Sequence, residues 1–457
     1  MKPITIPNIT IPVIGLPTIG IPSASGGGLA WTAGFKESIK AIYDPAKQGM
    51  TNYDVIEAYV EDFTNWNYVK ARGTATVSQH KFIITECILK GLSIVEDIQE
   101  PYSNLTVRIT GITDNQGVLI TDYVNGQHQI INTITEDGIY TIEDRHHFIG
   151  FGCNFVGTCN ITIEQLPTSI LKDLSGNGNH AYLYGGKGKL NSGVGIYKED
   201  FSTYTYKNQA ILSDISPNKF IINEVKGVNG FLYTGKMTSN PMTIQVDGEF
   251  NGVSFRYLYG NNGIKFVVIT EPGTYELPAS DGSTSNNGFF GTEQTGKCNI
   301  IVTQIPDYPN QLCYDGMMYA VCYGFPILTD YTIIADRTWF DIRDISCFIG
   351  KRNRSGDNLG AFEFEFRANQ ALSFGRTNSI IFADSGIVYQ TKNSYNGIGI
   401  ESGLLDDTDV LIIGAAQQNI NNNPQDIYIG CHGKIIIADR SFTEDEITWL
   451  KDNWKKI

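Results

Sequence analysis

The stretch Leu171–Gly185, Leu-Lys-Asp-Leu-Ser-Gly-Asn-Gly-Asn-His-Ala-Tyr-Leu-Tyr-Gly, decides the fold of this chain. Asp173 stands between two leucines, and a run of Ser, Gly and Asn follows over 175–179. Glycine and asparagine tolerate positive φ, so this run predicts a tight turn. The alternating residues 181–184 then predict a strand that stops at a pair of glycines. A turn that feeds a strand in this way is typical of a β-sheet protein.

The end of the chain carries a second signal. In Gly433–Ile447 an apolar run predicts a strand, and Thr443 with Glu446 forms a capping box that begins a helix. Together the two stretches resemble the marks near the start and at the end of laminin-G-like, concanavalin A-type β-sandwiches. The resemblance implies an all-β fold, a concanavalin A-like (LamG) jelly-roll sandwich.

Composition agrees with an all-β protein and excludes several function classes. The 457 residues include 48 Gly, 24 Tyr and 23 Phe, which favour strands and turns over helices. The formal net charge of −14, without a basic stripe, argues against a nucleic-acid partner. No apolar run approaches the roughly 20 residues of a membrane span, and prolines interrupt the N-terminus where a signal peptide would be continuous. The eight cysteines are too sparse for a disulfide scaffold, and we interpret them as buried free thiols.

A proline-ruled arm opens the chain over residues 1–30. Proline fixes φ and removes a donor, so the arm is expected to be extended and to end in the flexible hinge 23–28. We interpret it as an anchor that lies in a groove of another protein, because exposed apolar surface seeks a partner. The alternative is a mobile tail. The anchoring residues are four apolar–proline pairs: Ile6, Pro7, Ile11, Pro12, Leu16, Pro17, Ile21 and Pro22.

An internal repeat divides the rest. Ile134–Tyr140 matches Ile269–Tyr275, and Gly157–Pro167 matches Gly296–Pro306 in the same order. Upstream, Leu105–Gly111 resembles Met242–Gly248. Similar segments in one order indicate a duplicated β module. We therefore expect a sandwich in three parts, 31–69, 168–239 and 308–457, interrupted by two inserted, homologous β modules at 70–167 and 240–307.

Candidate catalytic groups are few. Glu363 and Glu365 alternate in a predicted strand and so share one face, but the three-acid pattern of sandwich glucanases does not occur. The adjacent His146 and His147 face opposite ways in an extended chain, which disfavours a shared metal ion. The sequence therefore predicts no catalytic residue and no cofactor.

The laminin-G-like resemblance also implies where calcium could bind. Members of the family often carry an acidic pair after an Asp-Gly, but here Asp315-Gly316 precedes Met317 and Met318. Calcium prefers oxygen ligands, so we expect Asp315 to be structural and predict no metal site.

The segment 42–52 (Ile-Tyr-Asp-Pro-Ala-Lys-Gln-Gly-Met-Thr-Asn), the split sandwich and the strand at 328–333 resemble proteins of bacteriophages and prophages. The resemblance implies a non-enzymatic virion structural protein, a head or tail fibre or decoration, assembled in the host cytoplasm. The arm would bind other virion proteins of capsid or tail, and the protein would be a homo-oligomer.

Two alternatives stay open. One is a lectin-like protein that binds a host-surface glycan or receptor through rim loops of the sandwich, with Trp31, Trp66 and Trp339 as candidates for an aromatic platform. The other is a glycan-cleaving enzyme that uses Glu363 and Glu365.

Overall fold

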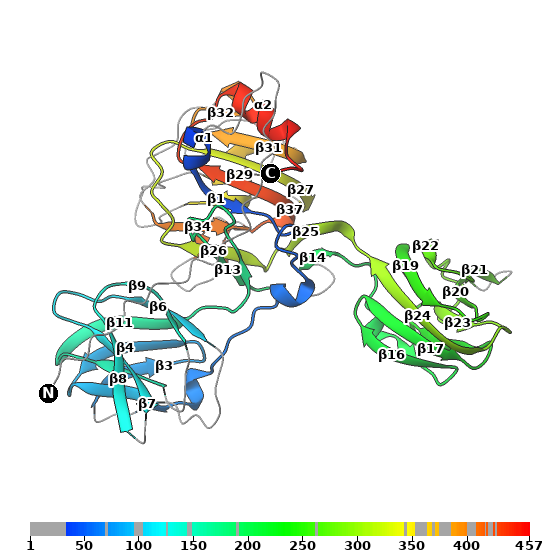
Figure 1. Cartoon of the computed structure of the whole chain (residues 1–457), viewed down its shortest axis with the longest axis horizontal. Helices are drawn as coiled ribbons and strands as arrows, with labels where there is room; N and C mark the ends of the chain where they lie inside the picture. The colour runs from blue at the N-terminus through cyan, green and yellow to red at the C-terminus, as the bar shows by residue number, and fades with distance from the viewer. Residues whose placement is uncertain are drawn as a thin grey trace.

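The protein is built almost entirely of antiparallel β-sheets, with two α-helices among the described residues, α1 (Ala33–Glu37) and α2 (Glu444–Asp452). The computed structural model describes residues 33–68, 72–95, 104–124, 127–143, 149–188, 192–260, 264–341, 345–351, 363–367, 371–373, 385–399, 408–415, 417–418, 424–425 and 427–457. Figure 1 shows three lobes: a central one that holds both helices, and two smaller ones. Within the described ranges, no helix has the length and apolarity to span a bilayer.

The central lobe, called the sandwich below, contains two large sheets. The first has the order β14-β25-β37-β27-β31-β32-β33 with β1 beside β37, and the second has the order β12-β13-β26-β34-β28-β29-β30. The first sheet comprises β14 (Gly193–Ile196), β25 (Asp307–Asp315), β37 (Ile429–Ala438), β27 (Thr332–Asp341), β31 (Gly386–Thr391), β32 (Ser394–Tyr395), β33 (Ile398–Gly399) and β1 (Ile39–Tyr43). The second comprises β12 (Ile170–Leu171), β13 (Ala181–Tyr184), β26 (Tyr319–Tyr323), β34 (Val410–Ile413), β28 (Ile345–Gly350), β29 (Glu363–Arg367) and β30 (Ala371–Ser373).

One continuous core joins the two sheets. Ile333 and Ala335 of β27 contribute to it together with Ala320 and Cys322 of β26. The intervening Ile334 belongs to a different cluster on the other face of β27, as the period of two in a strand requires. An all-β sandwich was predicted, and the sheets agree at this level.

The two smaller lobes are β modules of the same construction. The first module (58–167) contains sheets β2-β5-β10-β7-β8 and β3-β4-β11-β6-β9. Its strands are β2 (Asn67–Tyr68), β3 (Gly73–Val77), β4 (Lys81–Cys87), β5 (Gly91–Val95), β6 (Leu105–Thr110), β7 (Val118–Val124), β8 (Gln127–Ile134), β9 (Gly138–Ile142), β10 (Ile149–Cys153) and β11 (Gly157–Gln165).

The second module (198–306) repeats this order strand for strand, as β15-β18-β23-β20-β21 and β16-β17-β24-β19-β22. Its strands are β15 (Thr205–Tyr206), β16 (Ala210–Ser216), β17 (Lys219–Val225), β18 (Gly230–Tyr233), β19 (Met242–Glu249), β20 (Phe255–Gly260), β21 (Lys265–Ile269), β22 (Gly273–Leu277), β23 (Gly288–Gly291) and β24 (Gly296–Ile305).

The boundaries 70 and 240 need correction. Residues 205–233, expected in the sandwich, form β15–β18 and pair within the second module. Phe201 and Tyr204 are buried in the core of that module, and Phe63 and Trp66 are buried in the core of the first. Each module therefore starts earlier than predicted, because an aromatic pair ahead of its first strand is needed to fill its core.

The turn of the opening motif holds β1 on the sandwich. The buried Asp173 carboxylate accepts hydrogen bonds from the backbone N–H groups of Ile42, Ser175 and Asn179, at 2.8 to 3.1 Å. Asn177 and Asn179 donate from their side-chain amides to the Lys40 carbonyl at 3.2 and 2.7 Å. The polar residues of the motif are thus used for structure.

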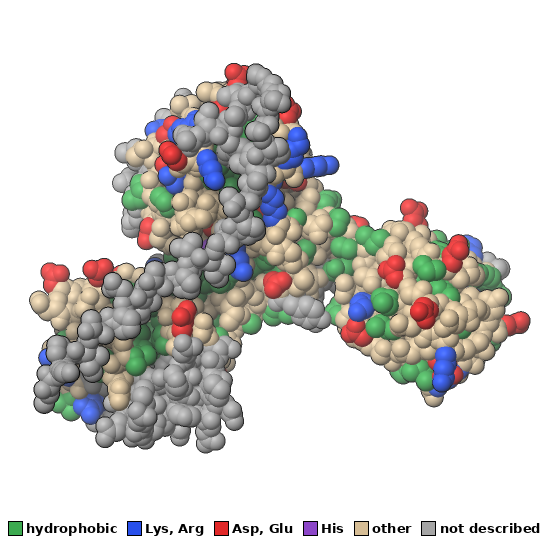
Figure 2. All heavy atoms as spheres, viewed as in Figure 1, with side chains coloured by type: hydrophobic (Ala, Val, Ile, Leu, Met, Phe, Trp, Pro, Cys, Tyr) green, Lys and Arg blue, Asp and Glu red, His purple; other side chains and the backbone are tan. Residues whose placement is uncertain are grey.

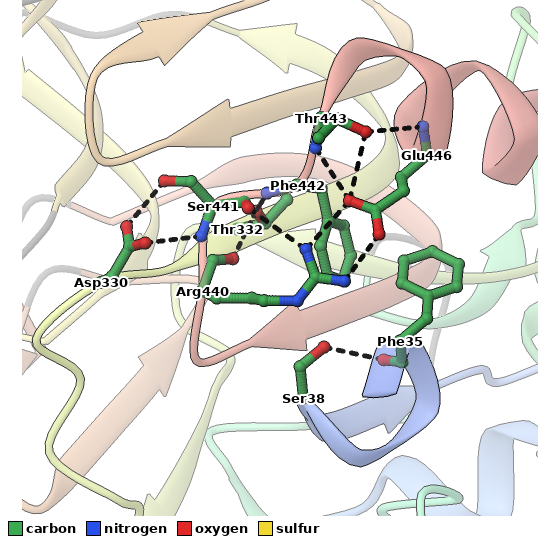
Figure 3. A network of polar contacts seen from close by, with 9 residues as sticks. All are labelled: Phe35, Ser38, Asp330, Thr332, Arg440, Ser441, Phe442, Thr443 and Glu446. Carbon is green, nitrogen blue, oxygen red and sulfur yellow. Dashed lines mark hydrogen bonds and ion pairs between the residues drawn. The ribbon is translucent and has the colours of Figure 1, made fainter. Parts of the chain in front are cut away.

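The closing motif docks α2 on the outer face of the first sheet, where Phe35 and Ile334 also pack (Figure 3). Arg440 forms a two-point ion pair with Glu446, at 2.9 and 2.6 Å, and its guanidinium lies over the Phe442 ring. Thr443 and Glu446 form the predicted capping box. Nearby, the Asp330 carboxylate accepts from the Ser441 backbone and hydroxyl. We conclude that this network fixes the last helix.

The interpretation of all cysteines as free thiols is wrong for one pair. Cys87 and Cys153 form a disulfide that joins β4 to β10 across the first module. The equivalent place in the second module holds Val225 against Gly291, where a Cβ would lie 2.8 Å from a valine methyl. The other six cysteines are free thiols.

Candidate functional site

A polar recess of about 480 Å³ opens at one end of the first module and is called the tip recess below. Three segments form it: the β6–β7 loop, the β8–β9 turn and the residue after β10. Its lining residues are Ile112, Thr113, Asp114, Asn115, Gln116, Thr135, Glu136, Asp137 and Asn154.

Asp137 holds the loop in place. Its carboxylate accepts from the backbone N–H groups of Gly111 at 3.0 Å and Ile112 at 2.8 Å. Gly111 has φ +88°, and a Cβ there would lie 2.1 Å from the Asn160 carbonyl oxygen. The loop can therefore leave β6 at this angle only with glycine, and Asp137 satisfies the donors that the turn exposes.

Asn154 supplies an acceptor without a partner. Its Oδ1 is buried and has no hydrogen-bond partner within the part of the chain that the structure describes. The side chain occupies the space beside Gly117, where a Cβ would lie 2.7 Å from Nδ2. A buried acceptor left unpaired costs free energy that a donor from a ligand or water would recover.

The charge of the tip recess is acidic. Asp114, Glu136 and Asp137 are exposed, and no Lys or Arg is among the lining residues. Elsewhere, on the face in Figure 2, Asp and Glu side chains are scattered singly over the described surface. The tip recess differs because its carboxyl groups share one concave surface with amide and hydroxyl groups.

The second module lacks this recess chemistry. The loop that starts at Gly111 in the first module and the loop that starts at the equivalent Gly248 in the second have the same length. Phe250 and Val253 therefore take the places of Thr113 and Gln116. Both belong to the hydrophobic core of the second module. The residue equivalent to Asp137 in the second module is Pro272, whose side chain has no carboxylate. The duplicated ends have thus diverged, one polar and one closed by apolar side chains.

The first module is also docked on the sandwich. Leu166 packs with Tyr182, Tyr184 and Val321 on the outer face of the second sheet. The Arg108 guanidinium lies 4.4 Å from the centre of the Tyr323 ring. Burial is the first cause that raises the pKa of both Tyr184 and Tyr323, whose hydroxyls lie 3.1 Å apart. In the second module the residue equivalent to Arg108 is Gln245, which cannot make the cation–π contact.

The predicted site residues fall elsewhere. The anchor residues (Ile6, Pro7, Ile11, Pro12, Leu16, Pro17, Ile21 and Pro22), together with Trp31, His146 and His147, lie outside the described residues. Glu363 and Glu365 lie on β29 between β28 and β30. Trp66 is buried in the first module and therefore forms no aromatic platform, and Trp339 is partly buried against the sandwich core.

Asp315 has the structural role that was predicted. Its Oδ1 accepts from the backbone N–H groups of Met317 at 2.9 Å and Met318 at 3.2 Å. The Met318 side chain is buried in the sandwich core. In the described ranges, no group of three His, Cys, Asp or Glu residues is placed to hold a metal ion.

No sequence prediction included the tip recess. The sequence did contain an indication of the recess, because the aligned repeats differ at these positions. Thr113 and Asp137 in the first copy align with Phe250 and Pro272 in the second. Reading differences between the copies, rather than their similarity, points to this end of the first module.

No family model matches the chain, and no curated protein is similar to it. Among solved structures the chain is similar to sialidases of Trypanosoma rangeli. The complex with sialic acid has 10% identity and a TM-score of 0.24, with 85% of this chain and 84% of that chain covered. The complex with 2,3-difluorosialic acid has 10% identity, a TM-score of 0.24 and 91% of each chain covered.

These findings contradict the predicted function. The similar structures are sialidases, and neither a family model nor a curated protein supports a phage virion structural protein or its lectin-like alternative. We therefore retain neither. At TM-scores this low, the likeness carries no argument for sialidase activity.

Proposed function

We propose that this chain is a binding protein on a laminin-G-like, concanavalin A-like sandwich, and that the tip recess takes a lysine or arginine side chain of an extended peptide. The laminin-G-like type of sandwich is supported by the structural roles of the two motifs that resemble that family. The opening turn fastens β1 through Asp173, and the closing segment fastens α2 through Arg440 and Glu446.

The support for a cationic ligand is charge and hydrogen bonding. Ammonium and guanidinium groups carry donors and no acceptor. Asp114 and Glu136 offer carboxylates in the tip recess, and Asn154 Oδ1 offers a buried acceptor that has no partner among the described residues. Such a ligand therefore complements both the sign and the donor–acceptor polarity of the lining.

One observation carries the proposal: the two modules agree in every strand and differ at this end. Phe250 and Val253 close the second module, while Thr113 and Gln116 leave the first open. Because both copies have the same scaffold, the second module is an internal control.

The experiment measures binding of fluorescein-labelled octa-arginine and octa-lysine to the full chain by anisotropy, at two salt concentrations. Asp114→Asn with Glu136→Gln is expected to weaken binding by about tenfold, since each partly exposed ion pair contributes up to about 1 kcal/mol. The matched control removes two acids from the second module, Glu249→Gln with Glu271→Gln.

The outcome that contradicts the proposal is equal weakening by both double variants, which would indicate attraction to net charge alone. A second variant fills the recess without changing its charge, Thr113→Phe with Gln116→Val, as in the second module. It is expected to abolish binding. Three further points stay predictions: that the chain is not an enzyme, that it forms a homo-oligomer, and that its N-terminal arm binds partner proteins.

A further inference from the structure

The first strand of the sandwich, β1, ends beside a buried ion pair with a lysine in the middle of the last strand, β37. β1 pairs with β37 in the register Tyr43 with Ile435, so Asp44 comes directly opposite Lys434. Lys434 Nζ lies 3.6 Å from Asp44 Oδ2, and only 5% and 8% of the two side chains are exposed. The nucleophilic amine and the carboxyl group are therefore held within reach of each other, away from water.

The surroundings of Lys434 disfavour its charged form. Burial is the main cause that lowers the pKa of Lys434, and the nearby Lys47 acts in the same direction, against the carboxyl of Asp44. The Nζ atom donates to the Trp454 carbonyl and lies 5.2 Å from the centre of the Trp454 ring. Burial thus raises the share of the neutral amine, which is a nucleophile because it has a free electron pair.

Asp336 is a further ionisable group that acts on Lys434. Burial raises the pKa of Asp336, and Lys434 acts on it in the opposite direction. Gly433 lies beside it, and a Cβ at that glycine would be 3.0 Å from Asp336 Oδ2. Burial thus raises the share of protonated Asp336, and the charge of Asp336 acts on the pKa of Lys434. In its protonated form Asp336 can supply a proton.

A buried ion pair is a weak source of stability, because desolvation offsets the attraction between the charges. An amide in the same place carries no charge and keeps the two strands joined. The folded chain brings the two groups together in advance, which removes most of the entropy cost of the reaction.

We propose that Lys434 and Asp44 condense to an isopeptide bond in the folded protein. The ammonium of Lys434 first passes one proton to the Asp44 carboxylate, which leaves a neutral amine beside a carboxylic acid. The electron pair of neutral Nζ attacks Cγ of Asp44, the Nζ–Cγ bond forms, and one Cγ–O bond breaks. The leaving oxygen carries the proton from Lys434, takes a second one from Asp336 and departs as water, and Nζ releases one proton that restores Asp336. The step needs no oxidant, reductant or external reagent, and it does not depend on the proposed function.

The bond would tie the N-terminal strand of the sandwich to its C-terminal strand. Both modules lie between these residues in the chain, so the cross-link would close one covalent ring around them. Pulling or partial unfolding at either module could then not separate β1 from β37.

The test is the intact mass of the purified, fully denatured chain by mass spectrometry. The proposal expects a mass below that of the sequence by one water molecule, with the disulfide reduced, and a branched peptide joining the segments of Asp44 and Lys434 after proteolysis. The full sequence mass would overturn the proposal. This measurement on the unaltered chain decides the question even where variants fail to fold.

Three variants identify the chemistry. Lys434→Arg keeps the charge and is expected to show the full mass, which excludes dehydration elsewhere in the chain. Asp44→Asn is expected to lose one ammonia in place of one water, a result that a salt bridge cannot produce. Asp336→Asn is expected to leave a large share of the purified chain at the full mass; complete loss of one water molecule in this variant would remove Asp336 from the proposed step.

Discussion

Gln165 of the first module and Gln304 of the second make the same three hydrogen bonds. Gln165 Oε1 accepts from the backbone N–H groups of Val60 and Glu61, and its Nε2 donates to the Glu61 carbonyl at 2.8 Å. Gln304 repeats this with Lys198 and Glu199. Each glutamine is 1% exposed and joins the last strand of its module to the segment that leads into it.

Gln165→Leu and Gln304→Leu are therefore expected to destabilise the modules by similar amounts. Each leaves two backbone donors and one acceptor unpaired, a cost of about 2–3 kcal/mol. Hydrogen exchange followed by mass spectrometry would show the loss of protection confined to the altered module. Loss of protection in both modules from one substitution would show that they do not unfold independently.

The disulfide predicts different responses of the two modules to reduction. Breaking Cys87–Cys153 is expected to lower the free energy of unfolding of the first module by about 2–5 kcal/mol and to leave the second unchanged. Proteolysis with and without reductant would measure this. Thiol titration of the unreduced, denatured chain is expected to give six thiols; eight would contradict the bond.

Asp173→Ala is expected to release β1. The substitution removes acceptors of the Ile42, Ser175 and Asn179 N–H groups in a buried site, and we expect a loss of about 3 kcal/mol. The amide exchange of Ile42 reports the release. Asp62→Ala, which removes a similar contact from an exposed turn at Thr64, is the control and is expected to cost less than Asp173→Ala.

His432 predicts a pH dependence of stability. Burial lowers its pKa to about 4, and its Nε2 lies 2.9 Å from the Tyr314 hydroxyl. The unfolded chain binds a proton below about pH 6.5, whereas the folded chain does so only below about pH 4. The contribution of His432 to the free energy of unfolding is therefore fully present above about pH 6.5. It is lost as the pH falls from about 6.5 to about 4, by about 3 kcal/mol in all.

Denaturant unfolding at pH 7 and pH 4.5 would test this assignment. His432→Gln removes the titrating group and is expected to flatten the profile between these values. A profile of unchanged steepness in the variant would assign the acid sensitivity to other groups.

The sequence predicted the parts of the fold in which local chemistry is specific. The turn around Asp173 and the capping box at Thr443 form as expected because neighbouring residues satisfy them. The start of the second module was missed, although Glu61-Asp62-Phe63 is repeated as Glu199-Asp200-Phe201. A three-residue match of this kind indicates a module boundary only once Phe201 is known to be buried in the core of the second module.

The tip recess and the disulfide were not predicted for a related reason. Asn154 lines the recess with Asp114 only because β10 ends beside the β6–β7 loop. Cys87 and Cys153 are 66 residues apart, and pairing follows from the sheet order. Such contacts depend on long-range topology, which spacing along the chain does not reveal.

The glutamine contacts at the base of each module have a consequence for how such a chain can change. Lys198 and Asp307, the first and last residues around the second module, are joined by an ion pair of 2.6 Å. Because the chain leaves and rejoins the sandwich at neighbouring points around the second module, this module can be removed or exchanged with little disturbance to its host. An inserted module of this kind can be exchanged as a unit, so its binding specificity can change while the sandwich is retained.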